Sequence, residues 1–231
     1  MKIPINTTAN ITTKRIKKKF THKSTNIINI DIEYPNINLS KGKFIQMKIN
    51  SSYFSVANNF YSYAVNTLLH NAMEQYEMSQ KEDYPFNPYD VVMRYTITLN
   101  SNCTLSTYFD QYQYTGGAHG STLRLSSSYS LQTGNIITLK DLFKDNTNYK
   151  DLIIKEIQTQ ADQNLLINPG IYFDNYKILI EENFNEDSFY LSQKTIDFYY
   201  GQYEIAPYAT GIVVFSIPYQ KLEINSPQCI F

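Results

Sequence analysis

The stretch Tyr114-Thr115-Gly116-Gly117-Ala118-His119-Gly120 lies between two segments in which apolar and polar residues alternate. Alternation is the pattern of a half-buried strand, so one strand enters this stretch and another leaves it. Glycine adopts positive φ readily, as a tight reversal of the chain requires. We therefore expect the chain to reverse here, with positive φ at Gly116, at Gly117 or at both.

The alternating pattern extends outward from this reversal in both directions. Residues 89–99, 103–114 and 121–131 each read as a strand, and Asn100 to Asn102 forms the turn between the first two. This order predicts an antiparallel meander. Residues 44–78 predict a long helix that packs on the meander, with a possible break at residues 50–52. Its buried stripe falls at helical spacing: Tyr53, Ala57, Phe60, Ala64, Leu68, Ala72 and Tyr76.

Two further strands are expected before the long helix. Residues 11–20 form one with a basic face, and residues 26–34 form the next, which Pro35 ends. Lysines commonly guard the edge strand of a sheet, and this interpretation is preferred over a binding patch for an acidic polymer. The basic side chains are Lys14, Arg15, Lys17, Lys18 and Lys19.

The second half of the chain predicts helices and short strands. Thr138 with Asp141 resembles a capping box, so a helix is expected from about residue 139. Helices at 148–164 and 176–184, a hairpin of 188–191 with 195–200, and a strand at 212–217 follow. The expected fold class is therefore α+β: an antiparallel β-meander packed on a long helix, followed by a second smaller α+β subdomain. The expected domains are residues 1–125 and 126–231.

Composition narrows the classes of function. The chain has 231 residues, 42% of them hydrophobic, and a net charge of −1, so no global charge points to nucleic acid or membrane. No segment has the length of a membrane span, and the N-terminus lacks the apolar core of a signal peptide. As numbered the chain reads as cytoplasmic, and its compartment stays open. One disulfide between Cys103 and Cys229 is possible if the chain is exported, but their sequence separation gives no support for it, and two free thiols are the default.

No complete catalytic or metal set is present. The glycines of the reversal are not followed by Lys-Ser/Thr, which excludes a phosphate-binding loop. The three histidines show no His-x-x-x-His spacing, so no metal or cofactor is expected. Ser121, His119 and Glu204 could be imagined as a triad, but no Gly-x-Ser-x-Gly elbow supports it. We therefore expect no catalytic residues.

A second stretch, Tyr203 to Gly211, resembles the Tyr114–Gly120 stretch, because it too combines tyrosines with residues that constrain the backbone. His119 is expected to bond to backbone or to Glu204, joining the two halves. Pro207 restricts the backbone, so Tyr208 is a candidate protein-binding anchor. The predicted contact residues are Tyr114, Gly116, Gly117, His119, Tyr203, Glu204, Pro207 and Tyr208.

Four pieces of the sequence, in order, resemble a bacterial family of paired domains found in RsiV-type lysozyme-sensing anti-sigma factors and beside PdaC-type peptidoglycan deacetylase domains. These are Tyr34-Pro35, the Tyr114–Gly120 stretch, Thr133-Gly134 leading into residues 139–143, and Tyr203–Gly211 followed by residues 215–219. The chain also resembles family members from spore-forming bacteria that consist of the pair alone.

The resemblance implies a non-enzymatic binding or sensing module whose partner is a lysozyme-like protein or a peptidoglycan fragment. Two alternatives stay open. One is a hydrolase acting on cell-wall glycan through Glu204 and His119, and the other is an intracellular structural protein of a spore-forming bacterium.

Overall fold

The computed structural model describes residues 7–144 and 147–229. The chain divides into two compact units. The helix–sheet unit comprises residues 10–95 and 109–123, and the C-terminal unit comprises residues 1–9, 96–108 and 124–231. Strands β3, β4 and β5 contribute residues to both. The domain boundary expected near residue 125 stays a prediction.

The predicted meander is present. Strands β3, β4 and β5 are consecutive neighbours in a five-stranded sheet of order β1-β2-β3-β4-β5. Connections this short can join only antiparallel neighbours, because a parallel pair needs a long crossover. Positive φ at Asn102 and Cys103 makes the first of these turns. The bounds of the strands are β3 Tyr89–Ser101, β4 Thr104–Tyr114 and β5 Ser121–Ser130.

Strands β1 (Asn10–His22) and β2 (Thr25–Asn38) form an antiparallel pair at one edge of this sheet. Strand β2 also pairs in parallel with β3, over residues 28–32. The expectation that Pro35 ends β2 is wrong. Pro35 lies opposite Thr13 of β1 and beyond the residues of β2 that pair with β3. Because no β3 residue pairs with it, the N–H that proline lacks is not needed on that side, and the strand continues.

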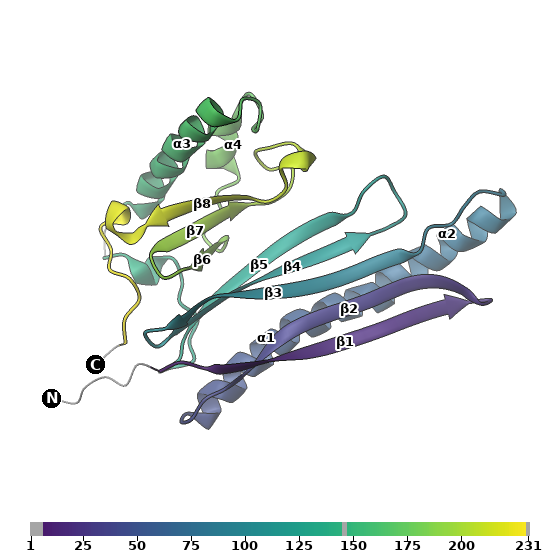
Figure 1. The fold of residues 1–231 in the computed structure, drawn as a ribbon, viewed down its shortest axis with the longest axis horizontal. Coiled ribbons are helices and arrows are strands. Elements are labelled where there is room, and N and C mark those ends of the chain that lie inside the picture. The colour runs from purple at the N-terminus through teal and green to yellow at the C-terminus, as the bar shows by residue number, and fades with distance from the viewer. Residues whose placement is uncertain (1–6, 145–146, 230–231) are drawn as a thin grey trace. The chain divides into compact units, whose positions relative to one another are not determined.

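One continuous helical run covers the sheet, and Figure 1 shows it lying along one face. It consists of α1 (Lys43–Tyr63), a π-helical turn (Ala64–Leu68) and α2 (Leu69–Lys81). The expected break at residues 50–52 is absent, and the irregularity lies at the π-helical turn instead. All seven residues of the predicted apolar stripe are buried, together with Ile49. The spacing of apolar residues therefore identified the buried face of the helix correctly.

The C-terminal unit packs helices on a three-stranded antiparallel sheet of order β6-β7-β8. Asp141 Oδ2 accepts a hydrogen bond from Thr138 N at 2.8 Å, as a capping box requires, but only a 3-10 turn (Lys140–Leu142) follows. The expected helix at residue 139 is thus a single turn. The elements are α3 Tyr149–Ile167, α4 Tyr176–Glu182, β6 Phe189–Leu191, β7 Thr195–Tyr200 and β8 Val213–Pro218.

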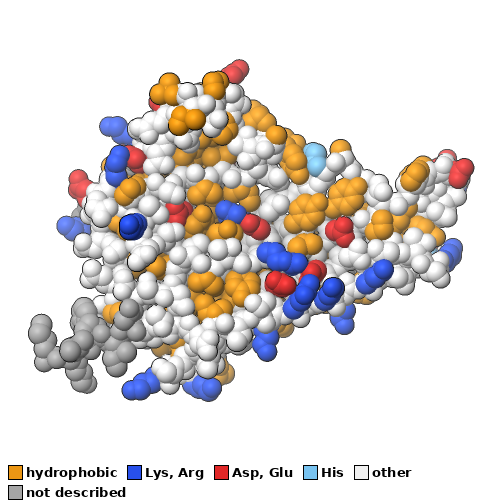
Figure 2. All heavy atoms as spheres, viewed as in Figure 1, with side chains coloured by type: hydrophobic (Ala, Val, Ile, Leu, Met, Phe, Trp, Pro, Cys, Tyr) orange, Lys and Arg blue, Asp and Glu red, His pale blue; other side chains and the backbone are white. Residues whose placement is uncertain are grey.

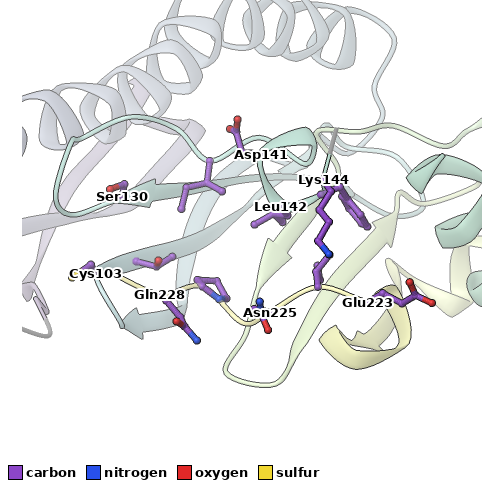
Figure 3. A pocket seen from close by; sticks show the side chains of 13 residues that line it. Cys103, Ser130, Asp141, Leu142, Lys144, Glu223, Asn225 and Gln228 are labelled. Atoms are coloured by element: carbon purple, nitrogen blue, oxygen red, sulfur yellow. The ribbon is translucent and has the colours of Figure 1, made fainter. Parts of the chain in front are cut away.

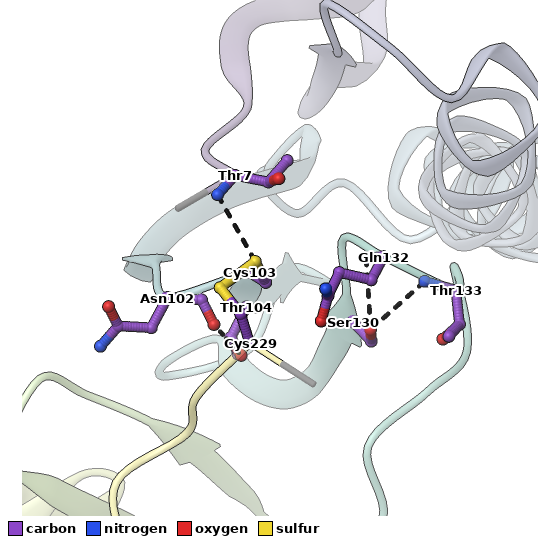
Figure 4. The surroundings of a disulfide bond; sticks show 8 residues. All are labelled: Thr7, Asn102, Cys103, Thr104, Ser130, Gln132, Thr133 and Cys229. Atoms are coloured by element: carbon purple, nitrogen blue, oxygen red, sulfur yellow. Dashed lines mark hydrogen bonds between the residues drawn. A yellow bond between two sulfur atoms is a disulfide. The ribbon is translucent and has the colours of Figure 1, made fainter. Parts of the chain in front are cut away.

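The two cysteines form a disulfide, so the default of two free thiols is wrong. Cys103 in the β3–β4 turn is bonded to Cys229, with a Cα–Cα distance of 5.1 Å across a sequence separation of 126 residues. Figure 4 shows the bond, with the backbone N–H of Thr7 directed at Cys103 Sγ, 3.4 Å away. The C-terminal segment and the segment before β1 therefore both meet the β3–β4 turn.

The fold class is confirmed: a mixed α+β chain with a five-stranded sheet, a long helix and a second small sheet. None of the helices in the described residues is long and apolar enough to cross a bilayer.

Candidate functional site

The predicted site residues fall into two groups, one in each compact unit. Tyr114 to Gly120, here called the glycine turn, connects β4 to β5. Gly116 has φ 84° and Gly117 does not have positive φ. A Cβ atom on Gly116 would lie 3.3 Å from Gln75 Oε1, whereas one on Gly117 would meet nothing within 4 Å. Of these two adjacent glycines, only Gly116 is therefore required by the geometry of the turn.

The other end of the glycine turn is also tightly packed. Gly120 is buried, and a Cβ atom there would lie 2.4 Å from the ring of Tyr112 on β4. A side chain at Gly120 would thus displace the tyrosine ring. The Gly-Gly-Ala-His-Gly pattern needs glycine at two positions for two reasons: positive φ at Gly116 and close ring packing at Gly120.

His119 is exposed, and its Nδ1 lies 3.1 Å from the carbonyl oxygen of Gly120. This contact to backbone agrees with one of the two roles expected for the imidazole. The other role, a bond to Glu204, would join the two units and stays a prediction.

Tyr203 to Gly211, here called the tyrosine loop, connects β7 to β8. Tyr203 has φ 67° and is 57% exposed. Its ring centroid lies 5.8 Å from that of Tyr208, which is partly exposed and follows Pro207. Gly211 ends the loop with φ 74° and ψ −149°, a conformation that only glycine adopts without strain. The loop therefore presents two adjacent aromatic rings on a constrained backbone.

Hydrogen bonds hold the tyrosine loop to the segment around α4. Phe173 N donates to the Ile205 carbonyl (3.1 Å), Asn183 Nδ2 donates to the Glu204 carbonyl (3.0 Å), and Thr210 Oγ1 donates to the Ile171 carbonyl (3.0 Å). The side chains of Ile205 and Ala206 are buried beneath it. These hydrogen bonds fix the loop near its start and near its end.

The side chain of Glu204 stabilises the start of the tyrosine loop. Its Oε2 accepts a hydrogen bond from the backbone N–H of Gly201 at 2.7 Å. Burial of the nearby Tyr200 hydroxyl, together with the charge of Glu204, raises the pKa of that tyrosine far above its usual range. Tyr200 therefore stays neutral and donates its hydroxyl proton to the Ile180 carbonyl.

The structure thus groups Tyr114, Gly116, Gly117 and His119 in the glycine turn, and Tyr203, Glu204, Pro207 and Tyr208 in the tyrosine loop. In the described part of the chain, no group of three or more His, Cys, Asp and Glu side chains is arranged to hold a metal ion.

The C-terminal unit also contains a cavity of about 390 Å³, which the sequence did not predict. Figure 3 shows the segment of residues 223–228 along one side of it, with Lys144 extending from the opposite side. Leu142, Phe143 and Pro227 supply apolar lining. No pattern in the last residues of the sequence signals this cavity.

Comparison with known proteins shows that two different family models match the two halves of the chain. Residues 21–122 match the family model described as Deacetylase PdaC, and residues 140–220 match a model described as Protein of unknown function (DUF3298). The chain is 23% identical over 194 residues to the peptidoglycan-N-acetylmuramic acid deacetylase PdaC of Bacillus subtilis (strain 168). The aligned region covers 78% of this chain and only 40% of that relative.

Two solved structures share the fold. A DUF3298 family member from Bacteroides fragilis NCTC 9343 superposes with a TM-score of 0.73 at 20% identity, covering 96% of each chain. A DUF3298 family protein from Pseudomonas aeruginosa PAO1 gives a TM-score of 0.58 at 16% identity, covering 93% of each chain. The resemblance inferred from the motifs is confirmed: the chain carries a PdaC-type segment followed in tandem by a DUF3298 segment.

Proposed function

We propose that this chain is a non-enzymatic binding module that recognises a cell-wall-related partner through the tyrosine loop. The observation that carries the proposal is the exposed ring of Tyr203, held at positive φ beside the ring of Tyr208. Tyrosine combines a large apolar ring with a polar tip and has few rotatable bonds, so it binds proteins at a low entropy cost.

The conformation of Tyr203 supports a binding role. A bulky residue at positive φ is strained and persists only where its surroundings fix it. Here the surroundings are the bonds from Phe173, Asn183 and Thr210 that anchor the loop. A loop that is already ordered loses less conformational entropy when a partner binds, which raises affinity.

The charge of the C-terminal unit favours a basic protein as the partner. This unit contains thirteen Asp and Glu residues against nine Lys and Arg residues. Three exposed carboxylates, Asp174, Glu181 and Glu182, lie in or next to α4, in the segment to which the tyrosine loop is hydrogen-bonded. Complementary charge speeds association and disfavours acidic partners. Between the two partner classes that the resemblance implies, we therefore favour a lysozyme-like protein over a peptidoglycan fragment.

The glycine turn is proposed as a second contact surface, because Gly117, Ala118 and His119 are exposed at its tip. It lies in the helix–sheet unit, so its contribution can be tested separately from that of the tyrosine loop.

The rival proposals make different use of the same residues. A wall hydrolase would need Glu204 as an acid or base, yet its carboxylate already accepts the N–H of Gly201. An intracellular structural role fits less well with a disulfide, because disulfides persist in oxidising compartments. We therefore propose a location outside the reducing cytoplasm.

Calorimetry against chicken-type lysozyme tests the binding proposal. Removing an anchor ring costs about 2 kcal/mol, so Tyr203→Gly and Tyr208→Ala should each weaken binding some thirtyfold. Tyr84→Ala is the matched control, because Tyr84 is an exposed tyrosine of the other unit. Its affinity should stay at the wild-type value.

Three results would contradict the proposal. No detectable heat with the wild-type chain at protein concentrations of tens of micromolar would remove lysozyme as the partner. Unchanged affinity in both loop variants would remove the tyrosine loop as the contact. Release of acetate or sugar from peptidoglycan by the wild-type chain, lost in Glu204→Gln, would support the hydrolase instead.

A further inference from the structure

The β1–β2 hairpin concentrates positive charge in a chain whose net charge is −1. Residues 10–38 contain six Lys and Arg side chains against two carboxylates. The whole helix–sheet unit has eleven basic residues against eight acidic ones, so the hairpin accounts for its positive sign. Figure 2 shows Lys and Arg side chains gathered where Figure 1 places β1 and β2.

The two carboxylates of the hairpin are already bound to arginines. Asp31 accepts hydrogen bonds from Arg15 Nε at 2.6 Å and from Arg94 Nη2 at 2.8 Å. Glu33 Oε1 lies 3.5 Å from Arg15 Nε, and Glu33 Oε2 lies 3.8 Å from Arg94 Nε. These carboxylates therefore balance Arg15 and Arg94, and they leave the lysines of β1 without an equal counter-charge.

In the register of the hairpin, Lys17 lies directly opposite Asp31, whose carboxylate binds Arg15 and Arg94, and Lys19 lies opposite the neutral Asn29. Among the residues that the structure describes, none places a carboxylate within ion-pair distance of Lys17, Lys18 or Lys19. All three lysines are exposed. Their charges therefore face solvent.

A groove of about 500 Å³ runs beside these lysines. Its walls are formed by Lys17, Lys18 and Lys19 of β1, by Asn29, Ile30 and the arginine-bound Asp31 of β2, and by Asp90, Val91 and Val92 of β3. Asp90 accepts a hydrogen bond from Asn29 Nδ2 at 2.8 Å. We call this surface the lysine groove. Alternate residues of a strand project on the same side, so Lys17 and Lys19 are spaced by roughly 7 Å along the edge of the sheet.

We propose that the lysine groove binds a linear phosphodiester polymer of the kind that cell walls carry, aligned along β1. A chain with a negative charge at each repeat complements a row of cations at regular spacing, and binding releases its condensed counterions. Lysine serves this purpose as a flexible point charge. The surface belongs to the helix–sheet unit and is independent of the tyrosine loop, so it can succeed or fail separately from the proposed function.

The alternative is that these lysines only guard the edge strand against pairing with other chains. The two roles predict different consequences when the charge is removed. A guard whose charge is lost allows self-association and leaves polymer binding unchanged, whereas a binding surface loses affinity.

The test measures binding of an oligomer of glycerol phosphate by fluorescence anisotropy, at about 50 and 200 mM salt. The triple variant Lys17→Gln, Lys18→Gln and Lys19→Gln should lose at least about tenfold in affinity at low salt and show a shallower salt dependence. The control variant carries Lys140→Gln, Lys155→Gln and Lys194→Gln. These lysines are exposed in the other unit, so the control has the same net charge. It should bind within about twofold of wild type.

Thermal melts of both variants establish that each is folded. Equal loss of affinity in the two variants would overturn the proposal, because net charge alone would then explain binding. Absence of binding by the wild-type chain would also overturn it. So would unchanged affinity with a new dimer in the hairpin variant, which shows an edge guard. Tighter binding of a single-stranded DNA oligomer of equal charge would assign the groove to nucleic acid instead.

Discussion

The carboxylate of Glu204 accepts a hydrogen bond from the backbone N–H of Gly201, 2.7 Å away, and so closes the turn that carries Tyr203. Glutamine retains an acceptor oxygen at this position and alanine does not. We expect Glu204→Gln to change the free energy of unfolding only slightly and Glu204→Ala to lower it by about 1–2 kcal/mol. Urea denaturation of the two variants measures the difference. If both variants lowered the free energy of unfolding equally, the negative charge of Glu204 would be the stabilising feature, and the hydrogen bond to Gly201 would not.

Short-range patterns predicted most of the elements. The buried face of the long helix and the strands β3 to β5 follow from spacing alone, because periods of 3.6 and 2 report which side of an element is buried. The continuation of β2 through Pro35 depends on where β3 stops pairing, which is a property of the assembled sheet. The Cys103–Cys229 bond likewise depends on the path of the last residues. A sequence separation of 126 residues does not indicate whether two cysteines lie close together in the fold.

The candidate site was predicted less completely. Tyrosines beside glycines in the sequence identified both loops. The sequence did not show which residues of these loops have positive φ. Gly116 and Tyr203 have positive φ and Gly117 does not. A glycine can adopt many conformations, so its presence alone does not tell which of two neighbours the turn needs. Positive φ at a tyrosine has no sequence signal, because it is imposed by the contacts of the whole loop.

The two adjacent glycines of the glycine turn should respond differently to substitution. Gly116→Ala places a Cβ at φ 84° and 3.3 Å from Gln75 Oε1, so it should destabilise the protein by about 1–3 kcal/mol. Gly117→Ala meets no atom within 4 Å and should stay within about 0.5 kcal/mol of wild type. Denaturation midpoints of the pair check this. A reversed order of stability would refute the assignment of Gly116 as the required glycine.

Reduction of the Cys103–Cys229 disulfide should destabilise the protein. The bond closes a long loop, and loss of such a cross-link typically costs about 2–5 kcal/mol because the unfolded chain gains entropy. Urea denaturation with and without reductant measures the change. The double variant Cys103→Ser with Cys229→Ser is the control, because it should be insensitive to reductant. Titration of two free thiols in the unreduced, denatured protein would show that the bond is absent.

Acid should weaken the hairpin through Asp31. The hydrogen bond from Arg15, followed by that from Arg94, lowers the pKa of Asp31 from 3.8 to about 2. Because the folded-state pKa is depressed, the stabilisation is present above pH 3.8 and is lost as the pH falls toward 2. Asp31→Asn should therefore flatten the fall in stability over this range. Asp90→Asn, which alters a carboxylate bonded to the neutral Asn29, is the control and should retain the fall.

Nuclear magnetic resonance titration of the Asp31 carboxyl carbon gives the pKa directly. A midpoint at or above the ordinary aspartate value in the folded protein would show that the two arginines do not hold this carboxylate in solution.

The backbone of Tyr203 predicts an unusual ranking of substitutions. At φ 67° a side chain bearing a Cβ is strained by about 1–2 kcal/mol, and glycine is not. Tyr203→Gly and Tyr203→Ala both remove the exposed ring and its contact with Tyr208. They differ only in the Cβ, so Tyr203→Gly should be the more stable variant by about 1 kcal/mol, against the usual order for these residues. Chemical denaturation of both variants measures the difference. If Tyr203→Ala were the more stable variant, Tyr203 would not have positive φ, and its backbone would no longer support an ordered tyrosine loop.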